Sequence, residues 1–105
     1  MPRNAITFEV KDEDFPSVKT AGAYCFMLNQ AGVRMGIKHT CPCGCGRWSA
    51  MWFKGFADAG GPEWDVVGQW PKVTLSPSIG VGRGEGLGGG YHWHGYLRAG
   101  VFVEE

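Results

Sequence analysis

The feature that most constrains this chain is the segment 39–46, which reads His-Thr-Cys-Pro-Cys-Gly-Cys-Gly. Cys41, Cys43 and Cys45 stand at alternate positions, and the residues between them force and permit sharp turns. Neighbours this close fit disulfide geometry poorly and form at most one bridge among themselves. Thiolates crowded on a turn commonly hold a soft tetrahedral cation, so the sequence predicts a structural zinc site with His39 as the fourth ligand. The alternative is a tight turn with half-buried cysteines that bind nothing.

The length and charge of the chain exclude several classes of protein. A chain of 105 residues is expected to form a single domain spanning 1–105. Ten Lys and Arg residues balance ten Asp and Glu residues, so no overall field favours nucleic acid or an anionic membrane. We expect neither as a partner. The start of the sequence lacks the apolar core of a signal peptide, and no stretch is long enough to span a bilayer. These features predict a cytoplasmic protein with reduced thiols.

The pattern of apolar residues predicts an all-β domain, mainly antiparallel, built of short strands and hairpins with little or no helix. Eighteen glycines and six prolines among fourteen aromatic residues are typical of many turns between short strands. The ambiguous part is 17–29, whose first half also fits a helix face, although its second half reads as a strand. The expected strands and hairpins are 6–10, 24–28 paired with 33–39, 47–54, 64–70, an extended 71–79, and 91–98 paired with 101–103 around Ala99-Gly100.

Two further places carry groups capable of chemistry. His92 and His94 are two residues apart in an expected strand, where alternation would put both imidazoles on one face, to grip a metal or to supply a base. Ser78 follows Pro77 and precedes a glycine-rich stretch at 80–90, so we expect its hydroxyl to be held rigidly beside free backbone N–H groups. The simpler interpretations are a packed or solvated histidine and an ordinary Ser-Pro turn.

Three blocks in order resemble the BubE-like family of small bacterial and phage proteins, some of which are encoded beside ubiquitin-like proteins and conjugating enzymes. The blocks are CPCGCG at 41–46, TLSPSI at 74–79 and HGYLRAG at 94–100. The resemblance implies a compact β-rich domain and a peptidase role toward ubiquitin-like tails or conjugates. By position it assigns functional roles to Ser78 and His94. Family members often carry a cysteine where this sequence has Tyr91, which leaves His39 or His92 to complete a metal site.

These observations combine into one hypothesis with two alternatives. The hypothesis is a serine/histidine hydrolase with Ser78 as nucleophile and His94 as general base, acting on a peptide tail or ubiquitin-like protein. Only Asp65 and Asp58 come into consideration as a third catalytic member, and the glycine-rich stretch supplies candidate oxyanion donors. One alternative is a zinc-dependent hydrolase that uses the pair of histidines in the last hairpin. The other is a zinc-stapled binding module without catalysis. The sequence leaves the oligomeric state open.

Overall fold

A computed structural model describes residues 3–56, 62–82 and 91–105, apart from the side chain of residue 91. Within these ranges the protein contains strands and one turn of 3-10 helix, η1 (Phe15–Ser17), and no α-helix, which confirms the predicted all-β class. The strands are β1 (Ala5–Ile6), β2 (Phe8–Glu9), β3 (Ala23–Leu28), β4 (Arg34–Thr40), β5 (Trp48–Phe53), β6 (Glu63–Val67), β7 (Thr74–Gly82), β8 (Tyr91–Arg98) and β9 (Val101–Glu104). No helix of the described ranges has the length and apolar character needed to cross a membrane.

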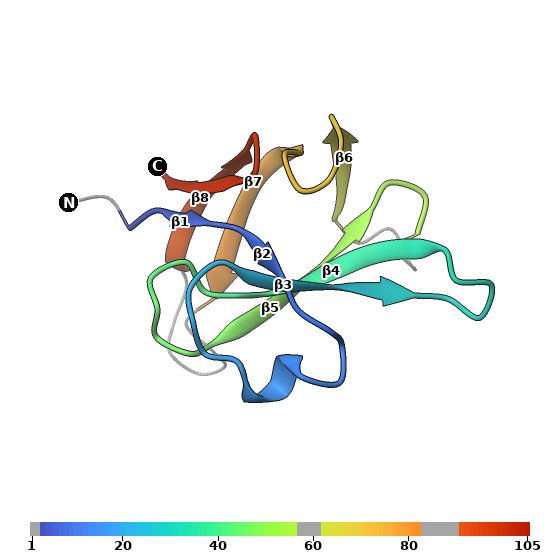
Figure 1. Cartoon of the computed structure of the whole chain (residues 1–105). Coiled ribbons are helices and arrows are strands. Elements are labelled where there is room, and N and C mark those ends of the chain that lie inside the picture. Colours follow the sequence, from blue (N-terminus) through green and yellow to red (C-terminus); the bar gives the residue numbers. More distant parts are fainter. Residues whose placement is uncertain (1–2, 57–61, 83–90) are drawn as a thin grey trace.

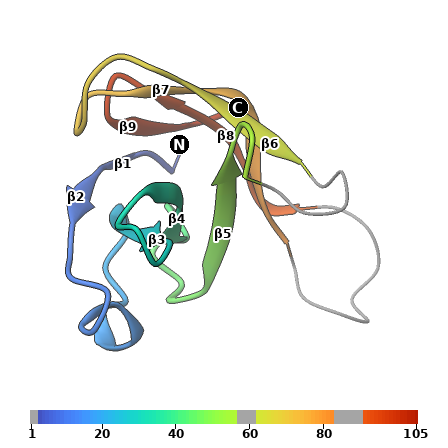
Figure 2. The ribbon, with the colours of Figure 1, turned by 90° about the vertical axis from the view of Figure 1, so that its right-hand side faces the viewer.

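The strands form one strongly curved sheet in the order β1-β9-β8-β7-β6-β5-β4-β3-β2. All neighbouring pairs are antiparallel except β2 with β3 and β5 with β6, which are parallel. Figure 1 shows β7 and β8 side by side above the β3, β4 and β5 group, and Figure 2 shows the sheet curling around the interior. Only two residue pairs join β5 to β6, so the sheet is thinly connected between its two halves.

The segment from residue 5 to residue 9 closes this sheet into a barrel-like shape. β1 pairs with β9 at one edge, and β2 pairs with β3 at the other. Between them, the Thr7 N–H donates to the carbonyl of Gly100 at 3.0 Å. Gly22 permits the approach on the second edge, because a Cβ atom there would collide with the Ile6 carbonyl oxygen. One short segment therefore satisfies backbone groups at both edges of the sheet.

The core lies inside the curl and is built largely from alternate residues of the longer strands. Trp93, Tyr24, Phe102, Ile37 and Met51 are its largest fully buried apolar side chains, each exposed by 2% or less. Aromatic residues supply much of this interior, since each buries a large apolar area. The aromatic content of the sequence is thus used to fill a small barrel-like core.

Most expected strands occur, with shifted ends. The ambiguous 17–29 region resolves into η1 followed by β3, and β3 pairs with β4 as an antiparallel hairpin as predicted. The expected strand 6–10 is split in two, because its halves pair with opposite edges of the sheet. The expected strand 64–70 ends at Val67, where Gly68 adopts a positive φ of 98°. Of the glycine-rich stretch, 83–90 lies outside the described residues.

Candidate functional site

Ser78 lies in an irregular part of β7. The pairs Leu75 with Leu97 and Ile79 with Gly95 match a step of four residues on β7 to a step of two on β8. The two extra residues form a bulge in Ser76-Pro77-Ser78, which locally lifts β7 out of regular pairing with β8. On the other side of β7, the indole Nε1–H of Trp64 donates to the Ser78 carbonyl oxygen at 3.2 Å. The bulge and the indole together fix the backbone that carries the Ser78 hydroxyl.

His94 reaches Ser78 from the neighbouring strand. Beyond the bulge, His94 is paired directly with Gly80. Because side chains alternate along a strand, Ser78 and Gly80 belong to the same face, and Gly80 has no side chain to separate the imidazole from the hydroxyl. His94 Nε2 lies 3.0 Å from Ser78 Oγ. The two residues are sixteen positions apart in the chain, and the pairing of β7 with β8 brings them together.

The other ring nitrogen of His94 faces a carboxylate. His94 Nδ1 lies 2.7 Å from Glu105 Oε2, and the Glu105 backbone N–H donates to the His94 carbonyl at 2.9 Å. A carboxylate at Nδ1 favours the tautomer with the proton on that nitrogen, which leaves the Nε2 lone pair facing Ser78. A hydroxyl, an imidazole and a carboxylate therefore lie in a row, with the two ring nitrogens of His94 facing Ser78 on one side and Glu105 on the other.

Sequence reasoning missed Glu105, although a signal for it was present. The last hairpin turns at Ala99-Gly100, with Arg98 opposite Val101 and Gly95 opposite Glu104. Continuing that register by one step puts Glu105 opposite His94. The residues considered for the third role do not fill it: Asp65 pairs with Lys54 at 3.7 Å, and Asp58 lies outside the described residues.

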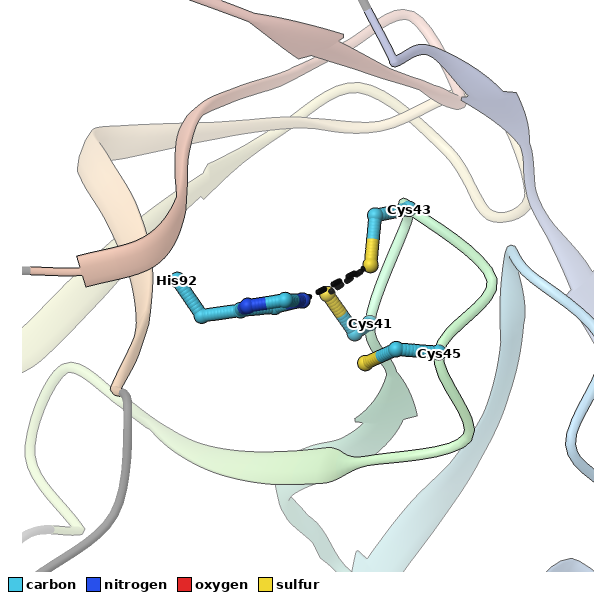
Figure 3. Close-up of side chains that lie close together, drawn as sticks. All are labelled: Cys41, Cys43, Cys45 and His92. Atoms are coloured by element: carbon cyan, nitrogen blue, oxygen red, sulfur yellow. Dashed lines mark hydrogen bonds between the residues drawn. The ribbon is translucent and has the colours of Figure 1, made fainter.

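The three clustered cysteines are presented by the turn that joins β4 to β5. The Cys41 N–H donates to the Arg47 carbonyl at 2.8 Å, and the Gly44 N–H donates to the Cys41 carbonyl at 3.0 Å. Gly44 has a φ of 85°, which glycine adopts without strain. The turn therefore aims its thiols toward one point, shown in Figure 3.

The fourth member of this cluster is His92. The ligand atoms of Cys41, Cys43, Cys45 and His92 all lie within 4.8 Å of one another, and His92 Nε2 is 2.9 Å from Cys43 Sγ (Figure 3). Around zinc with Zn–S bonds of about 2.3 Å, tetrahedral sulfur ligands are roughly 3.8 Å apart. The donor set, three thiols and an imidazole at this spacing, fits a structural tetrahedral site.

Burial and hydrogen bonding shift the pKa values of two of these thiols in opposite directions. Burial raises the pKa of the Cys41 thiol to about 12. For Cys45 burial acts in the same direction, but hydrogen bonds from the Arg47 backbone and from the neighbouring thiols outweigh it and lower the pKa. A bound cation would favour the thiolate of Cys41 strongly, because metal ligation requires the deprotonated form.

A β-bulge in β8 explains why the side chain of His92 reaches the cysteine cluster. Val81 pairs with Trp93 and Gly82 pairs with Tyr91, so one step on β7 matches two on β8 and His92 is the extra residue. A bulge re-aims the side chain of the residue it contains. The expectation that the two histidines of β8 act together on one metal is therefore not met. One imidazole lies against the thiols, and the other lies between a hydroxyl and a carboxylate.

His39, the expected fourth ligand, is not part of the cluster. Its ring stacks on Phe102 with centroids 5.0 Å apart, and its Nδ1 lies 3.1 Å from the Thr40 carbonyl oxygen. Complete burial lowers the pKa of His39 to about 4, so the ring is neutral. Its Nε2 is buried without a hydrogen-bond partner among the described residues. The residue packs in the core, and the structure offers His92 in its place beside the thiols.

A surface depression of about 490 Å³ adjoins the bulge of β7. It is lined by Lys54, Glu63, Asp65, Ser76 and Pro77, the last of which directly precedes Ser78. The depression offers space for part of a bound chain next to the candidate nucleophile.

The fold and the two sites define a class: a small all-β protein with a serine, histidine and carboxylate array beside a closed thiol and imidazole cluster. The family model described as bacterial ubiquitination-like system serine protease (BubE) matches residues 11–104. The chain belongs to this family, in agreement with the resemblance seen in its three sequence blocks. The match ends one residue before Glu105. Comparisons with curated proteins and with solved structures found no match.

Proposed function

We propose that this protein is a serine hydrolase, a peptidase or isopeptidase that cleaves the tail of a ubiquitin-like protein or its conjugates. The observation that carries the proposal is the 3.0 Å separation of Ser78 Oγ from His94 Nε2, with Glu105 on the opposite ring nitrogen at 2.7 Å. A hydroxyl, an imidazole and a carboxylate in this order form the array that activates serine nucleophiles. The family description, a serine protease of a bacterial ubiquitination-like system, supports the choice of a ubiquitin-like protein as substrate.

The residues have the following roles. His94 Nε2 takes the proton of Ser78 as Oγ bonds to the scissile carbonyl carbon, and the carboxylate of Glu105 stabilises the resulting imidazolium. His94 then gives that proton to the leaving amine as the carbon–nitrogen bond breaks, which leaves an ester on Ser78. Water attacks the ester, again with His94 as base, to release the acid and restore the hydroxyl. Of the glycine-rich stretch 80–90 that is proposed to donate to the oxyanion, 83–90 lies outside the described residues.

The test is covalent labelling by a fluorophosphonate, which reacts with activated serines. Wild-type protein should be labelled once, at Ser78, and Ser78→Ala should not be labelled while its melting temperature stays the same. Ser76→Ala is the matched control, because Ser76 belongs to the same bulge without contacting the imidazole, and it should label like the wild type. A protein that cleaves a ubiquitin-like tail without any such labelling would contradict the serine mechanism.

We further propose that Cys41, Cys43, Cys45 and His92 bind one structural zinc ion. Four protein ligands close a tetrahedral site and leave no open position for water, which is typical of zinc that braces a fold. Here the zinc would join the β4–β5 turn to β8, and its contribution would be to stability.

Metal content of purified variants separates His92 from His39 as the fourth ligand. His92→Gln should lose bound zinc during dialysis against a weak chelator, whereas His39→Gln should retain one zinc per folded chain. Retention of zinc by His92→Gln together with loss by His39→Gln would reverse the assignment.

The two alternative functions are less well supported. A zinc hydrolase built on both histidines of β8 requires His94 to face the cation, yet its ring nitrogens lie against Ser78 and Glu105. A binding module without catalysis does not require Ser78 and His94 to lie within hydrogen-bond distance. If the wild type is not labelled and cleaves nothing, the binding module becomes the better description.

A further inference from the structure

We propose that Arg3 is a positioning residue for the His94–Glu105 pair, an inference that rests on the proposed hydrolase function. Arg3 precedes β1 and touches neither Ser78 nor a ring nitrogen of His94 in the described contacts. It acts instead on the two strands that carry the pair, because its contacts join the end of β9 to the start of β8. We call this set of contacts, Arg3 with Glu104 and with His92 and Trp93, the clasp.

The first half of this clasp holds β9. The guanidinium of Arg3 donates to the Glu104 carboxylate from Nη2 at 2.5 Å and from Nε at 3.1 Å, and the Arg3 backbone N–H donates to the same carboxylate at 2.7 Å. The neighbouring Asn4 Oδ1 accepts the backbone N–H of Glu104 at 2.9 Å. The Arg3 and Glu104 side chains are 43% and 18% exposed, so the pair lies at the surface and its forked geometry, rather than burial, fixes the orientation of the carboxylate.

The second half holds β8. Arg3 Nη2 also donates to the His92 carbonyl at 3.1 Å, and the Trp93 indole Nε1–H donates to the Arg3 carbonyl at 2.9 Å. Trp93 is 1% exposed and packs edge-on against Phe102 in the core. Arg3 is therefore anchored to a buried part of the barrel, and its ion pair restricts the position of Glu104.

The catalytic pair comes directly after the clasped residues. His94 follows Trp93, and Glu105 follows Glu104, outside the last residue of β9. Glu105 has a half-exposed side chain, and its backbone N–H bonds only across to His94 among the described contacts. The Tyr96 hydroxyl also donates to Glu105 Oε1, at a long 3.5 Å, and a strand end held by these few bonds frays. By fixing β8 and β9 one residue earlier, Arg3 sets the register in which Glu105 Oε2 meets His94 Nδ1.

The experiment measures the tautomer of His94 and the turnover of the same variants. In wild-type protein with labelled histidine, ring nitrogen chemical shifts should show the proton on Nδ1 of neutral His94. In Arg3→Gln the shifts should indicate a mixture of tautomers. With a ubiquitin-like tail as substrate, kcat should fall roughly tenfold with KM little changed, because a small misplacement of the base slows the step without weakening binding.

Matched variants keep the test decisive. Glu104→Gln should reproduce both effects, and the double variant should be no worse than either single one, because the two residues act as one unit. Arg34→Gln removes an arginine that stacks on Phe26 in the other half of the sheet, and it should change neither readout. Arg3→Lys keeps the positive charge but loses the two-pronged hydrogen bonding of the guanidinium to Glu104, and it should show an intermediate effect. It replaces Arg3→Gln in the test if that variant does not fold.

The outcomes of the clasp and of the hydrolase are distinguishable. An unchanged His94 tautomer and unchanged kcat in Arg3→Gln would overturn the positioning role even if Ser78 is labelled normally. A wild-type tautomer with the proton on Nε2 would also overturn it, because the Glu105 contact would not exist. Absence of Ser78 labelling in the wild type would defeat the proposed function, while the tautomer readout would still report whether Arg3 orders the pair.

Discussion

The two sites of this protein differ in how the chain builds them. The thiol cluster takes three of its four members from one turn, and that turn is anchored by its own backbone hydrogen bonds. The Ser78, His94 and Glu105 array takes one member from each of three successive chain segments, and its geometry depends on how the strands pair, including the bulge in β7. The cluster includes the fully buried Cys41, whereas the catalytic imidazole and carboxylate are 35% and 53% exposed.

This difference agrees with the two proposed roles, stability for the thiol cluster and reactivity for the array. A closed, partly buried set of metal ligands stabilises a fold by joining two of its secondary-structure elements. Such a site needs no moving part and no exchange of ligands. A hydrolytic array must admit substrate and water, so it lies at the surface and relies on the sheet beneath it for precision. Changes at the thiols should therefore act on folding first, and changes at the array should act on turnover alone.

The largest expected effect is that of removing the nucleophile. Ser78→Ala should lower kcat on the order of 10⁴-fold or more, as losses of serine nucleophiles do. The thermal midpoint should remain within about 2 °C of the wild-type value, because Ser78 lies on a partly exposed bulge rather than in the core. Activity and melting temperature are measured on the same preparation. A large fall in melting temperature would contradict the idea that changes at the array affect turnover and not stability.

Loss of a buried thiolate should affect stability most strongly. Cys41→Ser should lower the free energy of unfolding by roughly 4 kcal/mol through loss of the bound metal, as measured by denaturant titration. Cys25→Ser is the matched control, since Cys25 is buried but stands outside the cluster. Similar destabilisation by both variants would show that the thiols of the turn contribute only as packed side chains.

Removal of the orienting carboxylate should slow turnover without unfolding the protein. Glu105→Gln should reduce kcat on the order of 100-fold, less than the loss of a fully buried orienting aspartate, because the Glu105 side chain is half exposed. Glu13→Gln, in the exposed turn before η1, should leave kcat unchanged. If Glu105→Gln retains full activity, the array works as a Ser–His dyad.

The smallest effect concerns acid stability. Hydrogen bonds from Arg3 lower the pKa of Glu104 below its ordinary value of about 4.5. A carboxyl group whose pKa is lower in the folded state contributes stability above its unfolded pKa, and that contribution is lost as the pH falls through the folded pKa. Thermal midpoints measured from pH 6 downward should therefore drop more steeply below about pH 4.5 in the wild type than in Arg3→Gln. Parallel curves would show that the clasp adds nothing to folding.

Features set by residues close together in the sequence can be predicted from it, whereas features that depend on β-bulges cannot. The three thiols were identified because they lie within five residues, and the hairpins were identified from alternation and turn residues. The fourth ligand was assigned to His39 by nearness in sequence, yet a one-residue bulge in β8 delivers His92 from 49 positions beyond Cys43. No pattern in a single sequence marks that bulge, because it results from the pairing of two distant strands.

The array of Ser78, His94 and Glu105 could be predicted in part from the sequence, and one of its members could have been found by counting register. Ser78 and His94 were named from family resemblance and from the rigidity of a Ser-Pro-Ser segment, and the structure brings them together. Glu105 required only that the register of the predicted last hairpin be counted one step further. The two-residue bulge on β7 that lifts Ser78 toward His94 could not be counted in this way, because it breaks the register.

The bulge at His92 also limits how this protein can change. In β8, His92 lies against the cysteine cluster and His94, two positions later, lies against Ser78. The one-residue bulge at His92 is what directs the two imidazoles to different partners. Deleting or adding one residue between them would turn one of the two imidazoles to the opposite face of the strand and separate it from its partners. The spacing of these two histidines in β8 is therefore tied to two separate clusters of side chains at once.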